Sequence, residues 1–289
     1  MGPGRGGAAA AALVVALGVA VAGCTSAPAP APRPAPVSSR QLDASVAQFR
    51  FDEGTRRLKA GVSNRSNRPV SVTEATIDWP PLAFPQVRLS SEPVLPGQTA
   101  AFTISYGTAR CGRPVGVAPV LVATIDGATR RLPLHVDQPG QLQRLQADAC
   151  AQQRLAATAS VELQLATRTE RIAGEEYLPA DLVLRRRTGT TAPVRVVDLG
   201  GSVLIELLPR GGAAALPGVL APGRSELRFP LLFGSGHRCD GHALGQSSQT
   251  FLMSAYLRLA DRPVQRVILP LSSTERDRIY GVVQRDCAH

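Results

Sequence analysis

Short runs of β-branched and other apolar residues recur along the chain. Three clear examples are Val70-Ser71-Val72-Thr73, Ala101-Phe102-Thr103-Ile104 and Val203-Leu204-Ile205-Glu206-Leu207. Turn-forming residues separate such runs at intervals of roughly 8–12 residues or a little more, among them Pro96-Gly97, Asp126-Gly127, Gly211-Gly212 and Pro222-Gly223. This alternation predicts an all-β protein built from antiparallel sandwiches or barrels.

The apolar pattern occurs twice. Val94-Leu95-Pro96-Gly97 corresponds to Val219-Leu220-Ala221-Pro222-Gly223, and the remaining matches are Pro69–Val72 with Pro193–Val196, Phe102 with Phe229, Arg110-Cys111 with Arg238-Cys239, Val120–Ile125 with Phe251–Leu257, and Leu132-Pro133-Leu134 with Leu269-Pro270-Leu271. A repeat of this kind indicates two copies of one structural unit. The sequence therefore predicts two tandem β-sandwich domains, at residues 40–152 and 155–289.

Each copy ends in a segment with helical periodicity before its last cysteine. Leu142 and Leu145 in the first copy match Ile279 and Val282 in the second, on one face of a helix. We expect a short C-terminal helix in each domain.

The strongest apolar run lies at the N-terminus, from Ala8 to Ala22. At about 1.5 Å per residue this run is too short to cross a hydrocarbon core of about 30 Å, which is typical of a signal peptide rather than a membrane span. After it, five prolines alternate with other residues between Thr25 and Pro36. This pattern predicts an extended, polyproline-like stalk.

The run closes on Val21-Ala22-Gly23-Cys24, which resembles the lipobox of bacterial lipoproteins. The resemblance implies cleavage before Cys24 and covalent diacylglycerol (a palmitate-type anchor) on its sulfur, so that residues 1–23 are the signal peptide and 24–39 the stalk. Two acyl chains anchor a protein stably. The alternative is an ordinary secretory peptide with a chance cysteine.

Four cysteines remain when Cys24 is set aside: Cys111, Cys150, Cys239 and Cys287. Paired cysteines outside the cytoplasm usually form disulfide bonds. Three connectivities are possible in principle, and the repeat favours Cys111–Cys150 with Cys239–Cys287. Each bond would tie the C-terminal helix of one domain to its Arg-Cys loop.

Composition changes the picture mainly by exclusion. The 289 residues carry 32 Lys+Arg and 22 Asp+Glu, a formal net charge of +10, yet Lys59 is the one lysine and aromatic residues make up 4%. Sparse aromatics, export and the lack of a recognition motif argue against nucleic acid as a partner. The Arg185-Arg186-Arg187 run could contact anionic lipid headgroups or wall polymers, or could be a polar strand face.

One cluster of possible metal ligands stands out, at His237, Cys239, Asp240 and His242. Two histidines five residues apart with a carboxylate could hold Zn²⁺ or Cu²⁺ on a loop. The alternative is solvated or hydrogen-bonded histidines beside a structural disulfide. Glu175-Glu176 with Asp181 lacks the spacing of a calcium loop and is expected to be a solvated loop.

No catalytic constellation is present in the sequence. There is no Gly-x-Ser-x-Gly elbow, no His-Glu-x-x-His and no phosphate-binding loop with lysine. We therefore predict that the protein is not an enzyme and has no catalytic residues.

Two further likenesses bear on architecture. The segment from Val62 to Val70 looks like a hairpin of immunoglobulin-like envelope domains, and Arg238-Cys239-Asp240-Gly241-His242 resembles a segment of uncharacterised actinobacterial cell-envelope lipoproteins. The resemblance implies a lipid-anchored location on the outer face of the cytoplasmic membrane and tandem immunoglobulin-like domains. We expect a non-catalytic binding or scaffolding module that meets an envelope protein or wall polymer. The alternatives are a metal or small-ligand carrier using the His237/His242 loop and an envelope enzyme whose site is not recognised.

Overall fold

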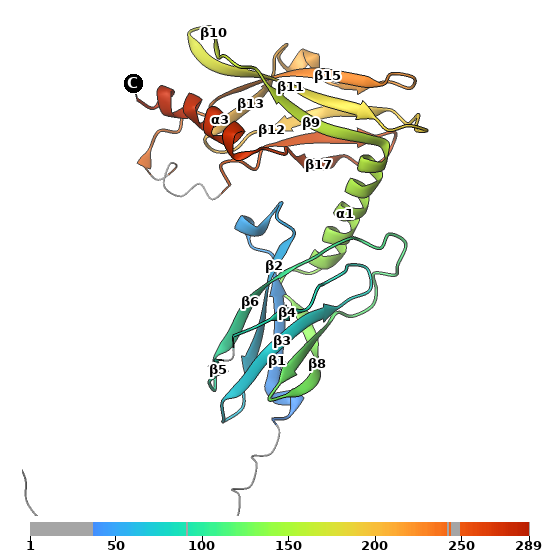
Figure 1. Ribbon diagram of the computed structural model, residues 1–289, viewed down its shortest axis with the longest axis vertical. Helices are drawn as coiled ribbons and strands as arrows, with labels where there is room; N and C mark the ends of the chain where they lie inside the picture. Colours follow the sequence, from blue (N-terminus) through green and yellow to red (C-terminus); the bar gives the residue numbers. More distant parts are fainter. Residues whose placement is uncertain (1–36, 91, 242, 244–248, 289) are drawn as a thin grey trace, which may run out of the picture. The chain divides into compact units, whose positions relative to one another are not determined.

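Strands dominate the protein, as Figure 1 shows. The structure is a computed structural model that describes residues 37–289 apart from 91, 242, 244–248 and 289. This confirms the coarse expectation of a mostly β fold. Helices α1 (Gln141–Thr158) and α3 (Ser273–Asp286) accompany the strands, with 3₁₀ turns η1 (Ser39–Gln41), η2 (Arg50–Asp52) and η3 (Ala213–Ala215). None of the helices described is long and apolar enough to cross a membrane.

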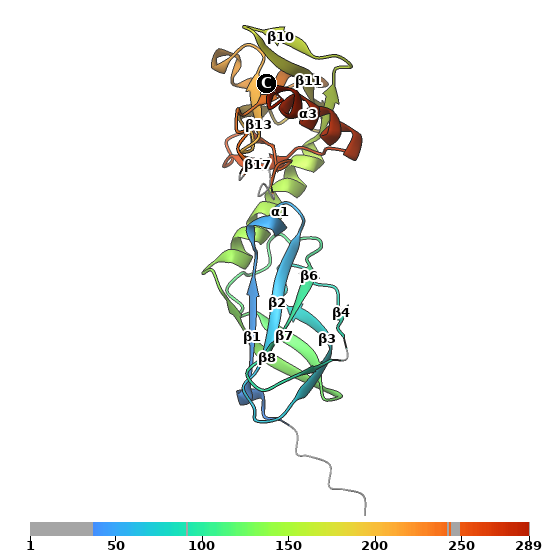
Figure 2. The ribbon, with the colours of Figure 1, turned by 90° about the vertical axis from the view of Figure 1, so that its left-hand side faces the viewer.

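The strands of the first half form one curled sheet. Their bounds are β1 (Leu42–Ala47), β2 (Arg57–Asn64), β3 (Val70–Asp78), β4 (Val87–Arg88), β5 (Pro93–Val94), β6 (Thr99–Ser105), β7 (Val120–Ile125) and β8 (Ala128–Val136). The order is β4-β3-β7-β8-β1-β2-β6, with β5 pairing the start of β3. Neighbours are antiparallel except β1 and β8, which are parallel. Figure 2 shows β1, β2 and β6 side by side, with β6 at the end of the row.

The second half has two sheets. Its strands are β9 (Ala159–Leu165), β10 (Glu170–Ile172), β11 (Glu175–Arg186), β12 (Val194–Gly200), β13 (Ile205–Pro209), β14 (Gly218–Leu220), β15 (Glu226–Ser235), β16 (Ser254–Leu259) and β17 (Gln265–Ile268). One sheet has the order β10-β11-β15-β13, with β9 also on β11, and the other has the order β14-β12-β16-β17.

Each half has its own hydrophobic core. The first core runs in sequence from Val37 to Cys150 and the second from Leu155 to Val283. In β1 the residues alternate between buried and half-buried, as expected for a strand with one face on a core. Trp79 is 1% exposed, and its indole N–H donates to the carbonyl of Val117 at 2.9 Å, so the largest core side chain keeps a polar partner.

Helix α1 differs from the sequence-based expectation. It does not end at Cys150 but continues to Thr158, so the predicted boundary at residues 152–155 falls inside a helix. Its first part contributes Leu142 and Cys150 to the first core, and Leu155 near its end belongs to the second. Helix α3 ends as expected, with Cys287 as its C-cap.

The strand registers align the two halves residue by residue. Phe102 pairs with Ala60 in the first half, and Phe229 pairs with Leu182 at the matching place in the second. A bulge follows Val72 in β3 and another follows Val196 in β12.

The register also corrects one match made from the sequence. Val70 pairs with Val94, and Val194 pairs with Leu220. Val94 therefore corresponds to Leu220 and not to Val219. The two Pro-Gly turns align without an extra residue.

Candidate functional site

Two of the residues proposed as metal ligands, Asp240 and His237, each contact different groups in the structure. Asp240 accepts hydrogen bonds from the backbone N–H of Ala243 at 2.8 Å and from Nε of Arg238 at 3.1 Å. Both contacts hold the pKa of Asp240 below its ordinary value, and the hydrogen bond from the Ala243 amide has the larger effect. The carboxylate is thus engaged within its own loop. His242 lies outside the described residues.

His237 contacts two other carboxylates instead. Its Nε2 lies 3.5 Å from Oε1 of Glu175, and its Nδ1 lies 3.2 Å from Oδ2 of Asp286. Because the two carboxylates contact opposite nitrogens of one ring, they do not converge on a common point where a metal ion would sit. The Zn²⁺ or Cu²⁺ site at His237, Asp240 and His242 stays a prediction, and sequence spacing gave no sign of Glu175 or Asp286 as neighbours.

The acidic residues Glu175, Glu176 and Asp181 lie on strand β11, so the expectation of a solvated loop was wrong, and each of them has its own partner. Glu175 accepts a hydrogen bond from the Tyr177 hydroxyl at 2.6 Å, which raises the pKa of Tyr177 to about 12. Glu176 pairs with Arg285 at 2.9 Å, and this hydrogen bond lowers the pKa of Glu176. Asp181 lies 3.5 Å from Arg228.

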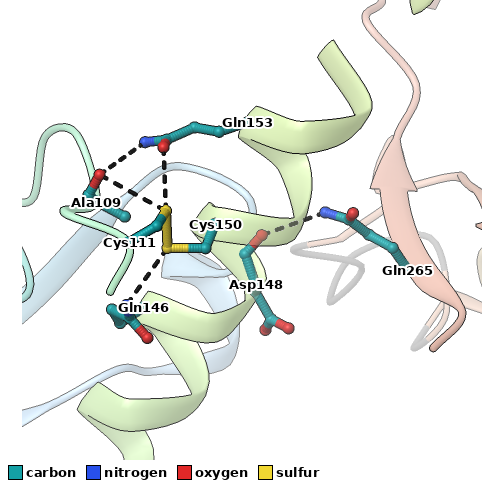
Figure 3. The surroundings of a disulfide bond; sticks show 7 residues. All are labelled: Ala109, Cys111, Gln146, Asp148, Cys150, Gln153 and Gln265. Atoms are coloured by element: carbon teal, nitrogen blue, oxygen red, sulfur yellow. Dashed lines mark hydrogen bonds between the residues drawn. A yellow bond between two sulfur atoms is a disulfide. The ribbon is translucent and has the colours of Figure 1, made fainter. Parts of the chain in front are cut away.

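Both expected disulfide bonds are present, Cys111–Cys150 and Cys239–Cys287. Figure 3 shows the first bond, where Gln146 donates from Nε2 to the sulfur of Cys150 at 3.3 Å and Gln153 donates from Nε2 to the carbonyl of Ala109 at 3.1 Å. The second lies beside Asp286, whose carboxylate has an oxygen within 4.8 Å of both sulfur atoms. Because both sulfurs are in a disulfide, neither is a thiolate that could bind a metal.

The basic run at the end of β11 is occupied by structural contacts. Arg185 forms ion pairs with Glu162 and, at 2.8 Å, with Glu226. Arg186 donates from NH1 to the carbonyl of Ala192 at 2.7 Å and from NH2 to that of Leu220 at 3.1 Å. These contacts favour the interpretation of the run as part of the strand framework rather than a lipid-binding patch.

A cavity of about 890 Å³ lies along α1. Its walls include Gln48, Tyr106, Gln141, Arg144 and Asp148. Burial raises the pKa of Asp148, opposed by the charge of Arg144, and burial likewise raises the pKa of Tyr106. Gln141 accepts a hydrogen bond from the backbone N–H of Gln48 at 3.2 Å. The walls thus combine these polar groups with apolar residues such as Leu145 and Leu155.

The edge of the first sheet, at β6, is a different kind of site. Within the described ranges β6 pairs with β2 and with no other strand. Hydrogen bonds at both ends fix which residues face β2: Asn64 N–H donates to the carbonyl of Gln98, and Tyr106 N–H donates to that of Arg56. In an antiparallel ladder this places the alternate residues on the opposite side. The backbone N–H and C=O groups that point away from β2 are those of Thr99, Ala101, Thr103 and Ser105.

The corresponding strand of the second half, β15, has its edge protected in two ways. β13 pairs with Leu231–Ser235, which correspond to residues 104–108, and the preceding part of β15 is protected by its own residues. By register Thr99, Ala101 and Thr103 correspond to Glu226, Arg228 and Pro230, since Ser63 pairs with Thr99 where Arg185 pairs with Glu226. Charged side chains, proline and a covering strand are the devices by which sheets protect their edges. Between Thr99 and Ser105, β6 has no charged residue and no proline. Beyond β6, Gly107 and Thr108 pair with Ala83, much as β13 pairs with the end of β15.

The side chains around the open edge are cationic and aromatic. Lys59, opposite Thr103, donates to its hydroxyl at 2.6 Å and lies 6.0 Å from the centre of the Phe51 ring. Phe51 stacks on Phe49 at 5.5 Å, and the two are 53% and 48% exposed. Arg57, opposite Ser105, is exposed. The hydrophobic pattern identified β6 as a strand, but no sequence signal identified its edge as open.

The comparisons with known proteins add little to this geometry. No protein-family model and no curated protein matches the chain.

Three solved structures show a weak likeness. The CupB2 chaperone of Pseudomonas aeruginosa is 18% identical, with a TM-score of 0.19, covering 62% of this chain and 86% of that one. The CsuC–CsuE chaperone–tip adhesion subunit complex of Acinetobacter baumannii is 14% identical, with a TM-score of 0.17, covering 60% and 82%. The YadV chaperone is 11% identical, with a TM-score of 0.18, covering 80% and 100%. At these scores the likeness assigns no function.

Proposed function

We propose that the chain is a lipid-anchored protein of the outer face of the cytoplasmic membrane, held through Cys24, that acts as a non-catalytic binding module. Its two halves are tandem immunoglobulin-like sandwiches, each tied by its own disulfide bond. The Val21–Cys24 segment supports the anchor, although it lies outside the described residues. The disulfide bonds support an extracytoplasmic location, because such bonds persist in oxidising compartments.

The observation that carries the binding role is the contrast between β6 and β15. The same edge of the repeated unit carries Glu226, Arg228 and Pro230 in the second half, and an uncharged run without proline from Thr99 to Ser105 in the first. An exposed, uncharged edge is a template for another strand. We infer that β6 receives an extended segment of a partner by strand addition, in which main-chain hydrogen bonds supply affinity.

Four residues of β6 offer backbone groups to such a segment. Each main-chain hydrogen bond contributes about 0.5–1.5 kcal/mol net in water, and part of this is offset by ordering the incoming segment. Binding of this kind suits a reversible adaptor. It also requires no reactive side chain, in keeping with a non-catalytic role.

The test transfers the charged residue and the proline of the β15 edge to β6. In the variant Ala101→Arg/Thr103→Pro, β6 receives the residues that β15 has at the matching positions. Both positions direct their N–H groups away from β2, so the ladder to β2 is kept. The control Ala101→Ser/Thr103→Ser retains both N–H groups and adds no charge.

A photoreactive residue at Thr99 in the full chain reports the partner in cells, with the same residue at exposed Thr129 as the reference site. We expect an adduct from position 99 that persists in the serine control and disappears in the Arg/Pro variant. On the purified complex, amide exchange should slow at Ala101 and Thr103 and stay unchanged at Ala100 and Phe102. An adduct that is indifferent to the Arg/Pro variant would show that strand addition is wrong.

The anchor has a separate test. Cys24→Ala should move the protein from the membrane fraction to the soluble fraction after a salt wash. If the variant stays membrane-bound, the lipid anchor is not at Cys24.

A further inference from the structure

We propose that the segment received by β6 is acidic and carries an apolar or aromatic side chain. This deepens the proposed function and rests on it. The chemistry follows from what surrounds the open edge on the outer face of the sheet.

The first observation concerns charge. Arg57 and Lys59 are neighbours on the outer face of β2, directly opposite Ser105 and Thr103. Among the described residues neither is part of an ion pair, whereas Arg185, Arg210 and Arg228 of the second half each have a carboxylate partner. β6 itself has no charged residue. A segment added beside β6 would therefore meet two cations that have no ion-pair partner, because the acidic residue of this face, Asp43, lies two strands away opposite Ser63 and pairs with Arg65.

The second observation is independent of charge. Phe49 and Phe51 are stacked with nearly parallel rings, 10° apart, and both are about half exposed. Their place is fixed next to the same edge by Lys59, which lies near the Phe51 ring and donates to Thr103. Exposed apolar groups that adjoin an unpaired strand mark a contact surface. An apolar side chain of the incoming segment can pack on Phe51.

One incoming segment can make both the charge contact with Arg57 and Lys59 and the apolar contact with Phe51. Side chains of an added strand alternate between the faces of the sheet. Those on the outer face lie beside Thr99, Ala101, Thr103 and Ser105, in reach of Phe51, Lys59 and Arg57 through the cross-strand neighbours. An acidic residue and an apolar residue two positions apart satisfy both. Such a segment belongs to a partner protein, because this chain is itself cationic, with a net charge of +10.

The experiment uses the purified full chain and three nine-residue peptides. In all three, valine and threonine alternate around one central phenylalanine, and two flanking positions are glutamate, glutamine or lysine. Binding is measured by fluorescence anisotropy. The single lysine provides a second readout, since acylation of Lys59, located by mass spectrometry, should slow when the peptide is bound.

We expect the glutamate peptide to bind about fourfold more tightly than the glutamine peptide at low salt, because each glutamate reaches across β6 to Arg57 or Lys59 and a charge pair at roughly 10 Å in water gives about twofold. The preference should shrink at high ionic strength. Arg57→Ser/Lys59→Thr should abolish the preference while leaving the affinity for the glutamine peptide within about twofold. Arg110→Ser/Arg113→Ser, which removes two exposed arginines outside β2 and β6, is the matched charge control and should leave the preference unchanged. Phe51→Ser should lower the affinity for all three peptides.

The outcomes separate the two proposals. Equal binding of the glutamate and glutamine peptides, lost in Ala101→Arg/Thr103→Pro, would overturn the acidic partner and leave strand addition standing. Glutamate-peptide binding that survives the Arg/Pro variant would overturn strand addition itself. No binding of any peptide, with a dimer mass that reverts to monomer in the Arg/Pro variant, would make a second copy the occupant and overturn the acidic segment.

Discussion

Asn64 in the first half and Arg186 in the second solve one problem with different chemistry. Both residues end the strand that precedes the Pro-Val start of β3 or β12. Asn64 donates from Nδ2 to the carbonyls of Arg68 and Val94, at 2.8 and 2.9 Å. Arg186 donates to the carbonyls of Ala192 and Leu220, which the strand registers place at the corresponding positions. The repeated unit thus specifies two carbonyls that must be satisfied, not the residue that satisfies them.

The consequences of the two solutions differ. Asn64 is fully buried, and its Oδ1 also accepts hydrogen bonds from the N–H and hydroxyl of Ser66. Arg186 is half-buried and reaches two more carbonyls, those of Ala221 and Arg224. A short amide needs a tight buried turn around it, whereas a guanidinium spans the same gap from the strand.

The largest expected effect comes from removing the disulfide bonds one at a time. The sequence separations are 39 and 48 residues, so loop closure in the unfolded chain predicts a loss of about 4 kcal/mol for either bond in this model. Cys111→Ala/Cys150→Ala and Cys239→Ala/Cys287→Ala should each lower the free energy of unfolding by a similar amount. Denaturant titrations of both variants measure this. A loss in one half alone would mean that the halves do not depend equally on their crosslinks.

Asn64→Ala should be next in size. It removes the buried partner of the Val94 carbonyl and of the Ser66 N–H, while the Arg68 carbonyl keeps the Ser66 hydroxyl as a donor. We expect a loss of about 3 kcal/mol in the free energy of unfolding. Urea denaturation followed by the fluorescence of Trp79, which lies in the same core, reports the first half directly. A loss under 1 kcal/mol would mean that water or another donor replaces the amide.

Arg186→Ala should cost less, about 2 kcal/mol, because its partners are nearer to solvent and can be hydrated. Calorimetry should show the change in unfolding of the second half. Arg187→Ala, the neighbouring residue, serves as the control and should be close to neutral. Equal losses of unfolding free energy in the Asn64 and Arg186 variants would contradict the expectation that the buried donor contributes more than the half-buried one.

The smallest effect is a pH dependence of stability that Glu226 gives to β15 and that β6, which has no carboxylate, lacks. The hydrogen bond from Arg185, with the charge of Arg228, lowers the pKa of Glu226 below 4.5. A depressed carboxyl pKa stabilises the fold above the unfolded value, and this stabilisation is lost as pH falls through the folded value. Glu226→Gln should flatten the stability profile below about pH 4.5. Thr99→Gln, at the matching place in β6, should leave the profile unchanged in a thermal-melt series from pH 3 to pH 7.

Much of the fold followed from local pattern. Strand runs such as Val70–Thr73 and the match of Phe102 with Phe229 were readable, because side-chain alternation and turn residues act over a few positions. The cysteine pairing followed from the repeat. The sequence did not predict that Asn64 and Arg186 have the same role. That role depends on which backbone carbonyls lie near each side chain in the folded protein.

The candidate site was the less predictable part. Whether a neighbouring strand covers β6 or β15 depends on which sheet that strand joins, and this is a non-local choice. β4 pairs with β3 in the first half, while β13 pairs with β15 in the second. The loop residues misled for a similar reason: Asp240 is close to His237 in sequence, yet its carboxylate is taken by Ala243 and Arg238.

Helix α1 sets a rule for how the chain can change length. Cys150 and Leu155 lie on one unbroken helix but belong to different cores. Adding one residue between them would turn everything that follows by about 100° and advance it by about 1.5 Å, like a screw. Loops on either side can change length without this effect. Homologous proteins should therefore vary in loop length but keep the same number of residues between the positions of Cys150 and Leu155.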